Sequence, residues 1–220
     1  YRQGIFRRNR RRRMKHFIVF AFLLTMSIFS TAQNAFQSYK NLSQPERKWV
    51  RHHPLAALRT YKLSQMAAAE AQTLVNDPEF DGDGSGGMVD AFRHTLWMAL
   101  TAQKIGKSKA LALGRAHEEK SKLYFESCDP SEPNLPDSID SEMDFINNQK
   151  GADIGIKHRK ASFEDLVQIV RNTVVSGQCY KIKKNSKGEF LDYDGNVIPK
   201  EAMQGKWITP KILVQSNWRE

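Results

Sequence analysis

Asp90-Ala-Phe-Arg-His94-Thr-Leu-Trp97 is the stretch around which the fold is expected to form. It follows a glycine-rich run and opens an apolar segment with helical spacing. Side chains four residues apart leave a helix on the same face, so Asp90 and His94 share one face. The apolar positions lie on another face: Phe92, Leu96 and Ala99. The stretch therefore predicts a helix with an apolar side and a polar side that carries an acid and an imidazole.

Two later stretches combine polar and apolar residues in the same way. Ala116-His117-Glu118 lies in a second helical run, and Met143-Asp144-Phe-Ile-Asn147-Asn148 lies in a third. Asp, Asn and His are middling or poor helix formers and are costly to bury without a partner, so their place beside apolar positions needs a reason. The three stretches together predict one polar site inside a helical domain.

The whole pattern predicts a mainly α fold, with a single helical domain of about five helices and a small C-terminal β-hairpin in residues 33–220. Ser43-Gln-Pro-Glu46 has the form of a capping box, and Pro54 to about Val75 has helical spacing. The central helix is expected from Val89 to about Lys104, with Gly106 as its C-terminal cap. Further helices are expected from Ser108 to about Phe125, from Ser138 to near Gly151, and from Ser162 to Gly177.

After Gly177 the polarity alternates, as it does in strands. Tyr180-Lys-Ile-Lys and Glu189-Phe-Leu-Asp-Tyr-Asp are separated by Asn185-Ser-Lys-Gly188. This spacing favours a hairpin within about residues 178–200. The tail with Trp207 and Trp218 is expected to pack this small sheet against the helices.

The N-terminal segment carries the basic excess of the chain. The 220 residues include 34 Lys and Arg against 24 Asp and Glu, a net charge of +10 that by itself favours nucleic acid or an anionic membrane as a partner. Residues 1–32 hold eight of those basic residues and no acid, so the remainder is nearly neutral and no nucleic acid is expected as a partner. A peripheral contact with a membrane stays open.

The same segment has the pattern of a secretory signal peptide. Lys15 precedes an apolar run from His16 to Phe29 and the small residues Ser30-Thr31-Ala32, where cleavage is expected. Residues 1–13 are interpreted as an overlong start. Export to the periplasm or the extracellular space is therefore expected, with an uncleaved membrane anchor as the alternative. In an oxidising compartment Cys128 and Cys179 allow one disulfide, and two lone buried thiols are the alternative.

The glycine-rich run before the central helix resembles part of a calcium loop. Asp81, Asp83 and Ser85 take the first, third and fifth places of such a loop, and Gly86 takes the sixth. The twelfth place is Phe92 instead of the bidentate Glu that the loop needs. The run is therefore half of an EF-hand loop, and a flexible entry to the helix is the alternative.

The polar stretches together predict a site for a divalent cation. Carboxylates and imidazoles that converge bind such an ion, and the majority of oxygen atoms favours calcium, with magnesium or zinc as alternatives. The candidate metal ligands are Asp90, His117 and Asp144, with Glu118 as an alternative to His117. A bound ion polarises a phosphoryl or carbonyl oxygen and orients a water.

The other polar residues receive catalytic or substrate-binding roles. His94, held by Asp90 one turn earlier, is placed as a general base or acid, and the planar fork of Arg93 fits a phosphate. The candidate catalytic residues are thus His94, Arg93 and Glu118, and the candidate substrate-binding residues are Asn147, Asn148 and Trp97. The structural alternatives are a surface pair for Asp90 and His94, a surface ion pair for Arg93, and a core position for Trp97.

The motifs, taken in order, resemble an uncharacterised family of secreted bacterial proteins and toxin C-terminal domains. The resemblance covers roughly residues 43–160. It rests on Glu46, His53-Pro54, the glycine-rich run, Asp90-Ala-Phe-Arg-His94 with Trp97, Gly106, Ala116-His117-Glu118, and Met143-Asp144-x-x-Asn147-Asn148-x-x-Gly151. More distantly, Asp90 and Asp144 are similar in spacing to the essential aspartates of calcium-dependent lipid II phosphatase toxins. That similarity implies cleavage of a polyprenyl pyrophosphate linkage outside the cytoplasm.

Three functions are compatible with these patterns. The first is an exported metal-dependent hydrolase of a phosphoester or pyrophosphate bond, acting on a small or lipid-linked phosphate substrate. The second is a non-catalytic envelope binding module whose polar cluster fixes helix packing. The third is a peptidoglycan-cleaving enzyme, since the compartment fits and no nucleophilic Ser or Cys motif is evident.

Overall fold

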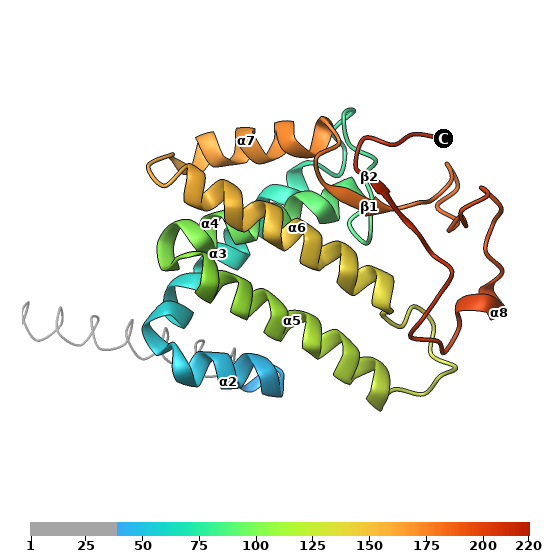
Figure 1. Cartoon of the computed structure of the whole chain (residues 1–220), viewed down its shortest axis with the longest axis horizontal. Helices are drawn as coiled ribbons and strands as arrows, with labels where there is room; N and C mark the ends of the chain where they lie inside the picture. The colour runs from blue at the N-terminus through green and yellow to red at the C-terminus, as the bar shows by residue number, and fades with distance from the viewer. Residues whose placement is uncertain (1–38) are drawn as a thin grey trace, which may run out of the picture. The chain divides into compact units, whose positions relative to one another are not determined.

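The computed structural model describes residues 39–220, and the expected signal peptide lies outside the described residues (Figure 1). The chain divides into two units, residues 1–42 and 43–220. In the first, Tyr39 and Lys40 are helical. The second holds α2 (Gln44–His52), α3 (Pro54–Thr73), α4 (Met88–Ile105), α5 (Lys107–Ser127), α6 (Ser138–Lys157), α7 (Phe163–Val175), β1 (Tyr180–Ile182), α8 (Lys200–Met203) and β2 (Leu213–Gln215). The prediction of a mainly helical fold with a small C-terminal sheet is confirmed.

Helix α4 is the centre of this unit. It packs against α3, α5, α6 and α7, and most of its side chains are buried, including Phe92, Leu96 and Ala99. These apolar residues belong to the main hydrophobic cluster of the described residues, together with side chains of α3 and α7. Because α4 is buried on nearly all sides, its polar residues Asp90 and His94 lie inside the fold.

The closest packing joins α4 to α6. A Cβ atom added at Gly151 would lie 2.1 Å from the Thr95 carbonyl oxygen, and one at Gly155 would lie 2.1 Å from the Ala99 carbonyl oxygen. Two glycines one helical turn apart therefore let the backbones of α4 and α6 touch. The expectation that this helix closes near Gly151 is corrected, since α6 continues to Lys157 and uses the glycine as a packing position.

Two helices begin at capping residues that the sequence indicates. Ser43 and Ser162 form the capping boxes of α2 and α7, and Gly106, with φ +86°, ends α4. The expectation that Ser108 caps the next helix is corrected, because α5 begins at Lys107 directly after Gly106. α6 begins after Asp137, whose carboxylate accepts hydrogen bonds from the backbone amides of Ile139 and Asp140.

The C-terminal sheet has a different strand partner from the expected one. β1 pairs with β2 in antiparallel register, with Lys181 opposite Val214, so the partner strand lies at residues 213–215 and not at 189–194. The expected turn at Asn185 exists, but it supports only an isolated bridge between Lys184 and Phe190. A second isolated bridge, between Leu191 and Val197, closes the next turn. The C-terminal tail thus returns to supply the strand whose backbone pairs with β1.

The structure also describes the two cysteines and the apolar character of the helices. Cys128 and Cys179 are both free thiols, Cys179 buried and Cys128 partly so, which matches the alternative of two lone thiols and not a disulfide. Among the described residues, no helix is long and apolar enough to cross a membrane.

Candidate metal and catalytic site

The loop before α4 and the first turn of that helix fix the position of Asp90. Gly86, with φ +84°, turns the chain into the helix, and its backbone amide donates a 2.8 Å hydrogen bond to Asp90 Oδ2. A carboxylate in the first turn is also favoured by the helix dipole. Asp90 is buried, and its second oxygen, Oδ1, remains directed at the neighbouring side chains.

Helix α6 brings two of its residues against this part of α4. His94 Nε2 lies 3.5 Å from Asp90 Oδ1 and 3.4 Å from Asp144 Oδ1. His94 Nδ1 lies 3.3 Å from Asn148 Oδ1. Ligand atoms of Asp90, His94 and Asp144 all lie within 4.8 Å of one another. Two carboxylates and one imidazole from two helices thus converge on a common point.

The protonation of His94 follows from its burial and from its contact with Asn148. Burial, together with the positive charges of Arg93 and His117, lowers the pKa of His94 well below its ordinary value. The ring is therefore neutral and carries one proton. An amide oxygen only accepts, so the contact with Asn148 places that proton on Nδ1. The lone pair of Nε2 then faces the two carboxylates.

Asp144 is the least favourably placed charge of the group. Burial, followed by the nearby carboxyl groups of Asp90 and Glu118, raises the pKa of Asp144 well above its ordinary value. Its Oδ1 is buried and makes no hydrogen bond to any described residue. A bound cation or a proton at this oxygen would remove the repulsion.

Arg93 and Glu118 border the cluster. The Arg93 guanidinium pairs with Asp90 Oδ1, and its side chain is 39% exposed, so part of it is open to solvent. Glu118 projects from α5, and its Oε1 is buried without a hydrogen-bond partner among the described residues. Burial and the charge of Asp90 raise the pKa of Glu118 to about 7, against the opposing effects of His117 and Arg93. A carboxyl group with this pKa exchanges protons near neutral pH.

Three predicted site residues are placed differently by the structure. His117 Nδ1 is bonded to Glu46 Oε1 at 2.9 Å, and His117 is not among the converging ligand atoms, so its assignment as a metal ligand is revised in favour of His94. Asn147 is fully buried and exchanges two hydrogen bonds with the backbone of Tyr180, a structural role that engages both polar atoms of its side chain. Trp97 packs against three apolar clusters and against the His117 ring, as its structural alternative expects.

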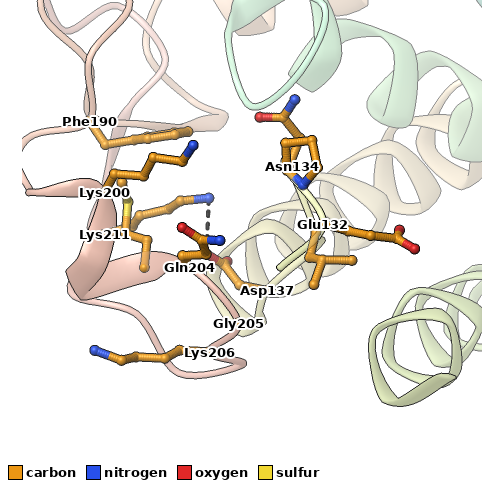
Figure 2. A pocket seen from close by; sticks show the side chains of 12 residues that line it. Glu132, Asn134, Asp137, Phe190, Lys200, Gln204, Gly205, Lys206 and Lys211 are labelled. Carbon is orange, nitrogen blue, oxygen red and sulfur yellow. Dashed lines mark ion pairs between the residues drawn. The ribbon is translucent and has the colours of Figure 1, made fainter. Parts of the chain in front are cut away.

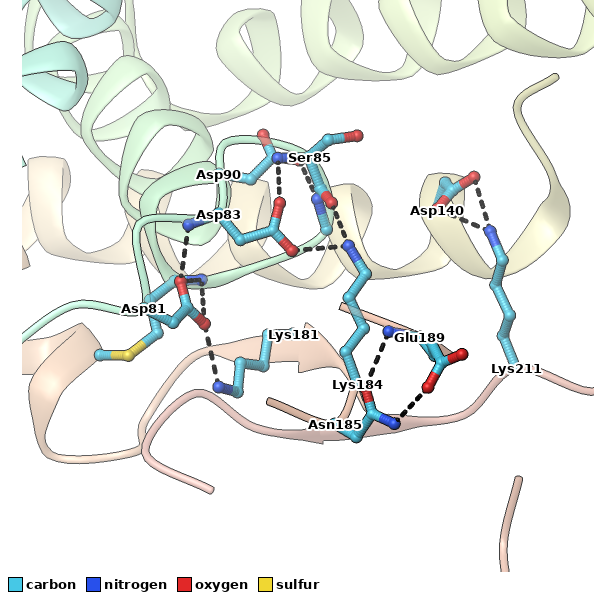
Figure 3. Close-up of polar contacts among 12 residues, drawn as sticks. Asp81, Asp83, Ser85, Asp90, Asp140, Lys181, Lys184, Asn185, Glu189 and Lys211 are labelled. Atoms are coloured by element: carbon cyan, nitrogen blue, oxygen red, sulfur yellow. Dashed lines mark hydrogen bonds and ion pairs between the residues drawn. The ribbon is translucent and has the colours of Figure 1, made fainter. Parts of the chain in front are cut away.

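The calcium-loop expectation is also revised. Asp81 and Asp83 accept hydrogen bonds from backbone amides of their own loop, and each has a lysine at its second oxygen (Figure 3). Lys181 Nζ lies 3.0 Å from Asp81 Oδ2, and Lys184 Nζ lies 2.6 Å from Asp83 Oδ2. The chain's own ammonium groups therefore neutralise these carboxylates.

Sequence reasoning missed the pair of Glu46 and His117. In the sequence Glu46 was recognised as part of a capping box and of the family resemblance, and Glu46 Oε2 does accept a hydrogen bond from the Ser43 amide at 2.8 Å. Its other oxygen holds His117, 71 residues later, and so ties α2 to α5. No local pattern announces a pair at this separation.

A cavity of about 110 Å³ lies away from the cluster (Figure 2). It is bordered by the loop before α6 and the C-terminal segment, and its lining contains none of the predicted site residues. Figure 2 shows Lys200 and Lys211 beside Phe190 on one wall, facing Glu132 and Asn134. The chemistry-bearing residues are therefore grouped at the α4–α6 contact and not in this cavity.

The comparison with known families covers the whole cluster. A family model described as "Domain of unknown function (DUF6973)" matches residues 47–178, more than half of the chain. The chain belongs to this family. The DUF6973 region runs from α2 to the residue that follows the turn after α7, and it includes Asp90, His94, Glu118, Asp144 and Asn148. No curated protein and no solved structure matches the chain.

Proposed function

We propose that this protein is an exported hydrolase that uses a divalent cation to cleave a phosphoester or pyrophosphate bond. The observation that carries the proposal is the convergence of Asp90 Oδ1, His94 Nε2 and Asp144 Oδ1 within 4.8 Å in the interior of the domain. Three electron-rich atoms at this spacing repel one another unless a proton or a cation lies between them.

The charge balance favours a cation. Asp90 and Asp144 supply two negative charges, and Arg93, the nearest permanent positive charge, pairs with Asp90 alone. Burying an unpaired carboxylate is costly, and a divalent ion compensates both acids at once. Asn148 fixes the tautomer and orientation of His94 from the far side of the ring, as outer partners of metal-bound histidines do.

The surrounding side chains fit hydrolysis of a phosphate compound. A divalent ion at this site would polarise a phosphoryl oxygen and lower the pKa of a water. Arg93 offers exposed donors for a second phosphate oxygen, and Glu118 is placed to hold or release a proton near neutral pH. His94 therefore changes role relative to its sequence-based assignment, from proton carrier to ligand, and Glu118 takes the proton transfer.

Two carboxylates and one imidazole are compatible with several divalent ions. Calcium prefers six to eight oxygen ligands, and here two carboxylates are joined by a nitrogen. A mixed set of imidazole and carboxylate also suits zinc or manganese. Calcium, magnesium, manganese and zinc therefore all belong in the test.

The substrate and compartment rest on the sequence. The similarity of Asp90 and Asp144 to lipid II phosphatase toxins supports a lipid-linked pyrophosphate, and the pattern of residues 14–32 supports export. A small phosphate compound is the alternative substrate.

Phosphate release from undecaprenyl pyrophosphate tests this proposal. The purified protein, treated with a chelator and then given each cation in turn, is expected to release phosphate with at least one of them. Asp90→Asn and Asp144→Asn should lose this activity. Asp153→Asn is the matched control, because Asp153 lies on α6 but is 60% exposed and pairs with Lys107. Equal phosphate release by all three variants would exclude the assignment.

A non-catalytic binding module is the second candidate, favoured by the buried hydrogen bond between His94 and Asn148. In that case the cluster fixes helix packing, and neither a cation nor a phosphate compound stabilises the protein. The same cation series followed by thermal unfolding separates the two candidates, since a bound ion raises Tm by mass action.

A further inference from the structure

The C-terminal segment after α7 contacts the N-terminal ends of α4 and α6, the two helices that carry Asp90 and Asp144. Asp90 lies in the first turn of α4, and Asp144 lies in the second turn of α6. The positions of both carboxylates therefore depend on how the N-terminal ends of these helices are held. Residues 179–220 follow the DUF6973 match, and three of their lysines bind at those two ends.

Two of these lysines hold the loop before α4. Lys181 pairs with Asp81, and Lys184 pairs with Asp83 and also donates to the Ser85 carbonyl oxygen at 2.7 Å (Figure 3). Between them, the Ile182 amide donates a 2.7 Å hydrogen bond to the Gly86 carbonyl oxygen. The other side of this peptide segment, the Gly86 amide, holds Asp90 Oδ2. These two hydrogen bonds link the segment that carries Lys181 and Lys184 to a carboxylate of the cluster.

The third lysine holds the start of α6. Lys211 Nζ lies 2.9 Å from Asp137 Oδ2, and the Thr209 hydroxyl donates to the same oxygen at 2.8 Å. Asp137 is the N-cap of α6 and is 2% exposed, so losing its partner would leave a buried carboxylate uncompensated. Lys211 also lies 3.4 Å from Asp140, one turn before Asp144.

The two contacts belong to one small structure. Lys181 lies in β1, and Lys184 lies two residues after the end of that strand. Lys211 lies two residues before the start of β2. The Phe190 ring contacts two of these ammonium groups: its centroid lies 4.8 Å from Lys184 Nζ and 4.1 Å from Lys211 Nζ. The β1–β2 pair and its flanking residues therefore connect the loop before α4 to the N-terminus of α6.

We infer that Lys181, Lys184 and Lys211, here called the lysine clamp, are positioning residues that set the separation of Asp90 and Asp144. The inference rests on the proposed function in that the separation matters for the affinity of a cation between the two acids. The lysine clamp itself touches neither the ion nor a substrate. It occupies the carboxylates of the glycine-rich loop with ammonium groups, where a calcium loop would use an ion.

The test compares Lys184→Met and Lys211→Met with Lys187→Met. Lys187 lies in the same segment and carries the same charge, but its side chain is exposed and makes no ion pair with the described residues. We expect both clamp variants to weaken cation binding by about tenfold or more, as the loss of outer-shell partners does, and Lys187→Met to leave it unchanged. Cation affinity is measured by calorimetric titration on full-length protein. A merely structural role would lower Tm and leave the affinity of the folded protein as it is, which would overturn the inference.

Amide hydrogen exchange supplies a readout that needs no cation. In Lys184→Met, exchange in residues 81–94 should accelerate, and in Lys211→Met exchange in residues 137–148 should accelerate, because those helix starts lose an anchor. If the wild-type protein binds no cation, the proposed function fails, and exchange alone decides whether the lysine clamp holds the two helix starts. Unchanged exchange in both variants overturns the inference.

Two further variants keep the test decisive. Thr209→Val removes one bond to Asp137 without leaving a charge unpaired, and it serves if Lys211→Met does not fold. Asp83→Asn combined with Lys184→Met should bind the cation no worse than Lys184→Met alone, since the lysine acts through this carboxylate. An additive loss in the double variant would contradict that route.

Discussion

At the scale of single residues, the site consists of a neutral imidazole that faces two acidic side chains. His94 is uncharged because it is buried, and Asn148 directs its lone pair at Asp90 and Asp144. The sequence predicted that Asp90 and His94 share a helix face, because spacing alone fixes that. It did not predict that His94 would lie at the centre of the group, because this depends on where α6 places Asp144 and Asn148.

Asp144→Asn should stabilise the ion-free protein. The folded-state pKa of Asp144 lies well above its ordinary 3.8, so ionisation of this carboxyl costs folding free energy as pH rises through that window. Removing the charge should therefore raise Tm at pH 7.5. Differential scanning calorimetry in the presence of a chelator measures this, with Asp153→Asn as the control. A fall in Tm would mean that Asp144 is stabilised by a partner other than a cation.

Glu46→Gln should reveal an acid-sensitive contact between α2 and α5. Burial alone would raise the pKa of Glu46, but the hydrogen bonds from His117 and Ser43 outweigh it and lower the pKa from 4.5 to about 2. A depressed carboxyl pKa contributes stability that is fully present above about pH 4.5 and disappears as pH falls towards 2. The contribution at neutral pH is about 3 kcal/mol at most.

Urea unfolding at pH 7, 4 and 3 measures this contribution. The difference in unfolding free energy between the wild-type protein and Glu46→Gln should be largest at pH 7 and should shrink at each step. A difference that is the same at every pH would show that Glu46 contributes through packing alone.

At the scale of elements, the contact between α4 and α6 determines the geometry of the site. The helix starts followed from caps in the sequence, such as Ser43 and Ser162. The predicted end of α6 was wrong because glycine is the residue type at which helices most often end. Only the tertiary contact with Thr95 explains why Gly151 lies inside the helix. The strand partner at residues 213–215 was missed because a pairing across 30 residues leaves no turn pattern nearby.

Gly155→Ala should disrupt this contact. The added methyl group would meet the Ala99 carbonyl oxygen at 2.1 Å, and backbone cannot move aside as a flexible side chain can. We expect a loss of at least about 2 kcal/mol in unfolding free energy and weaker cation binding, because Asp144 moves with α6. Gly84→Ala is the control, since a methyl group added there would have nothing within 4 Å and the φ of Gly84 is not positive. Chemical denaturation that finds the two variants equally stable would refute the close-packing argument.

At the scale of the whole molecule, the helical domain supplies the site and the C-terminal segment holds it. The sequence predicted the helical domain from periodicity and the polar cluster from residues that are unusual inside helices. It could not predict that Lys181 and Lys184 would take the carboxylates of the glycine-rich loop, because those pairs span 100 and 101 residues. The sequence also does not distinguish a polar residue that hydrogen-bonds the backbone, such as Asn147, from one that faces a ligand.

Calorimetric titration of the chelator-treated protein with calcium, magnesium, manganese and zinc decides whether Asp90, His94 and Asp144 bind a metal ion. At least one of these ions should bind with one ion per chain. Asp144→Asn should weaken this binding by at least about 100-fold, more than the loss of a residue that only hydrogen-bonds a metal ligand. Asp153→Asn should bind like the wild-type protein. Absence of binding by the wild-type protein, or equal binding by Asp144→Asn, would contradict a metal centre at Asp90, His94 and Asp144.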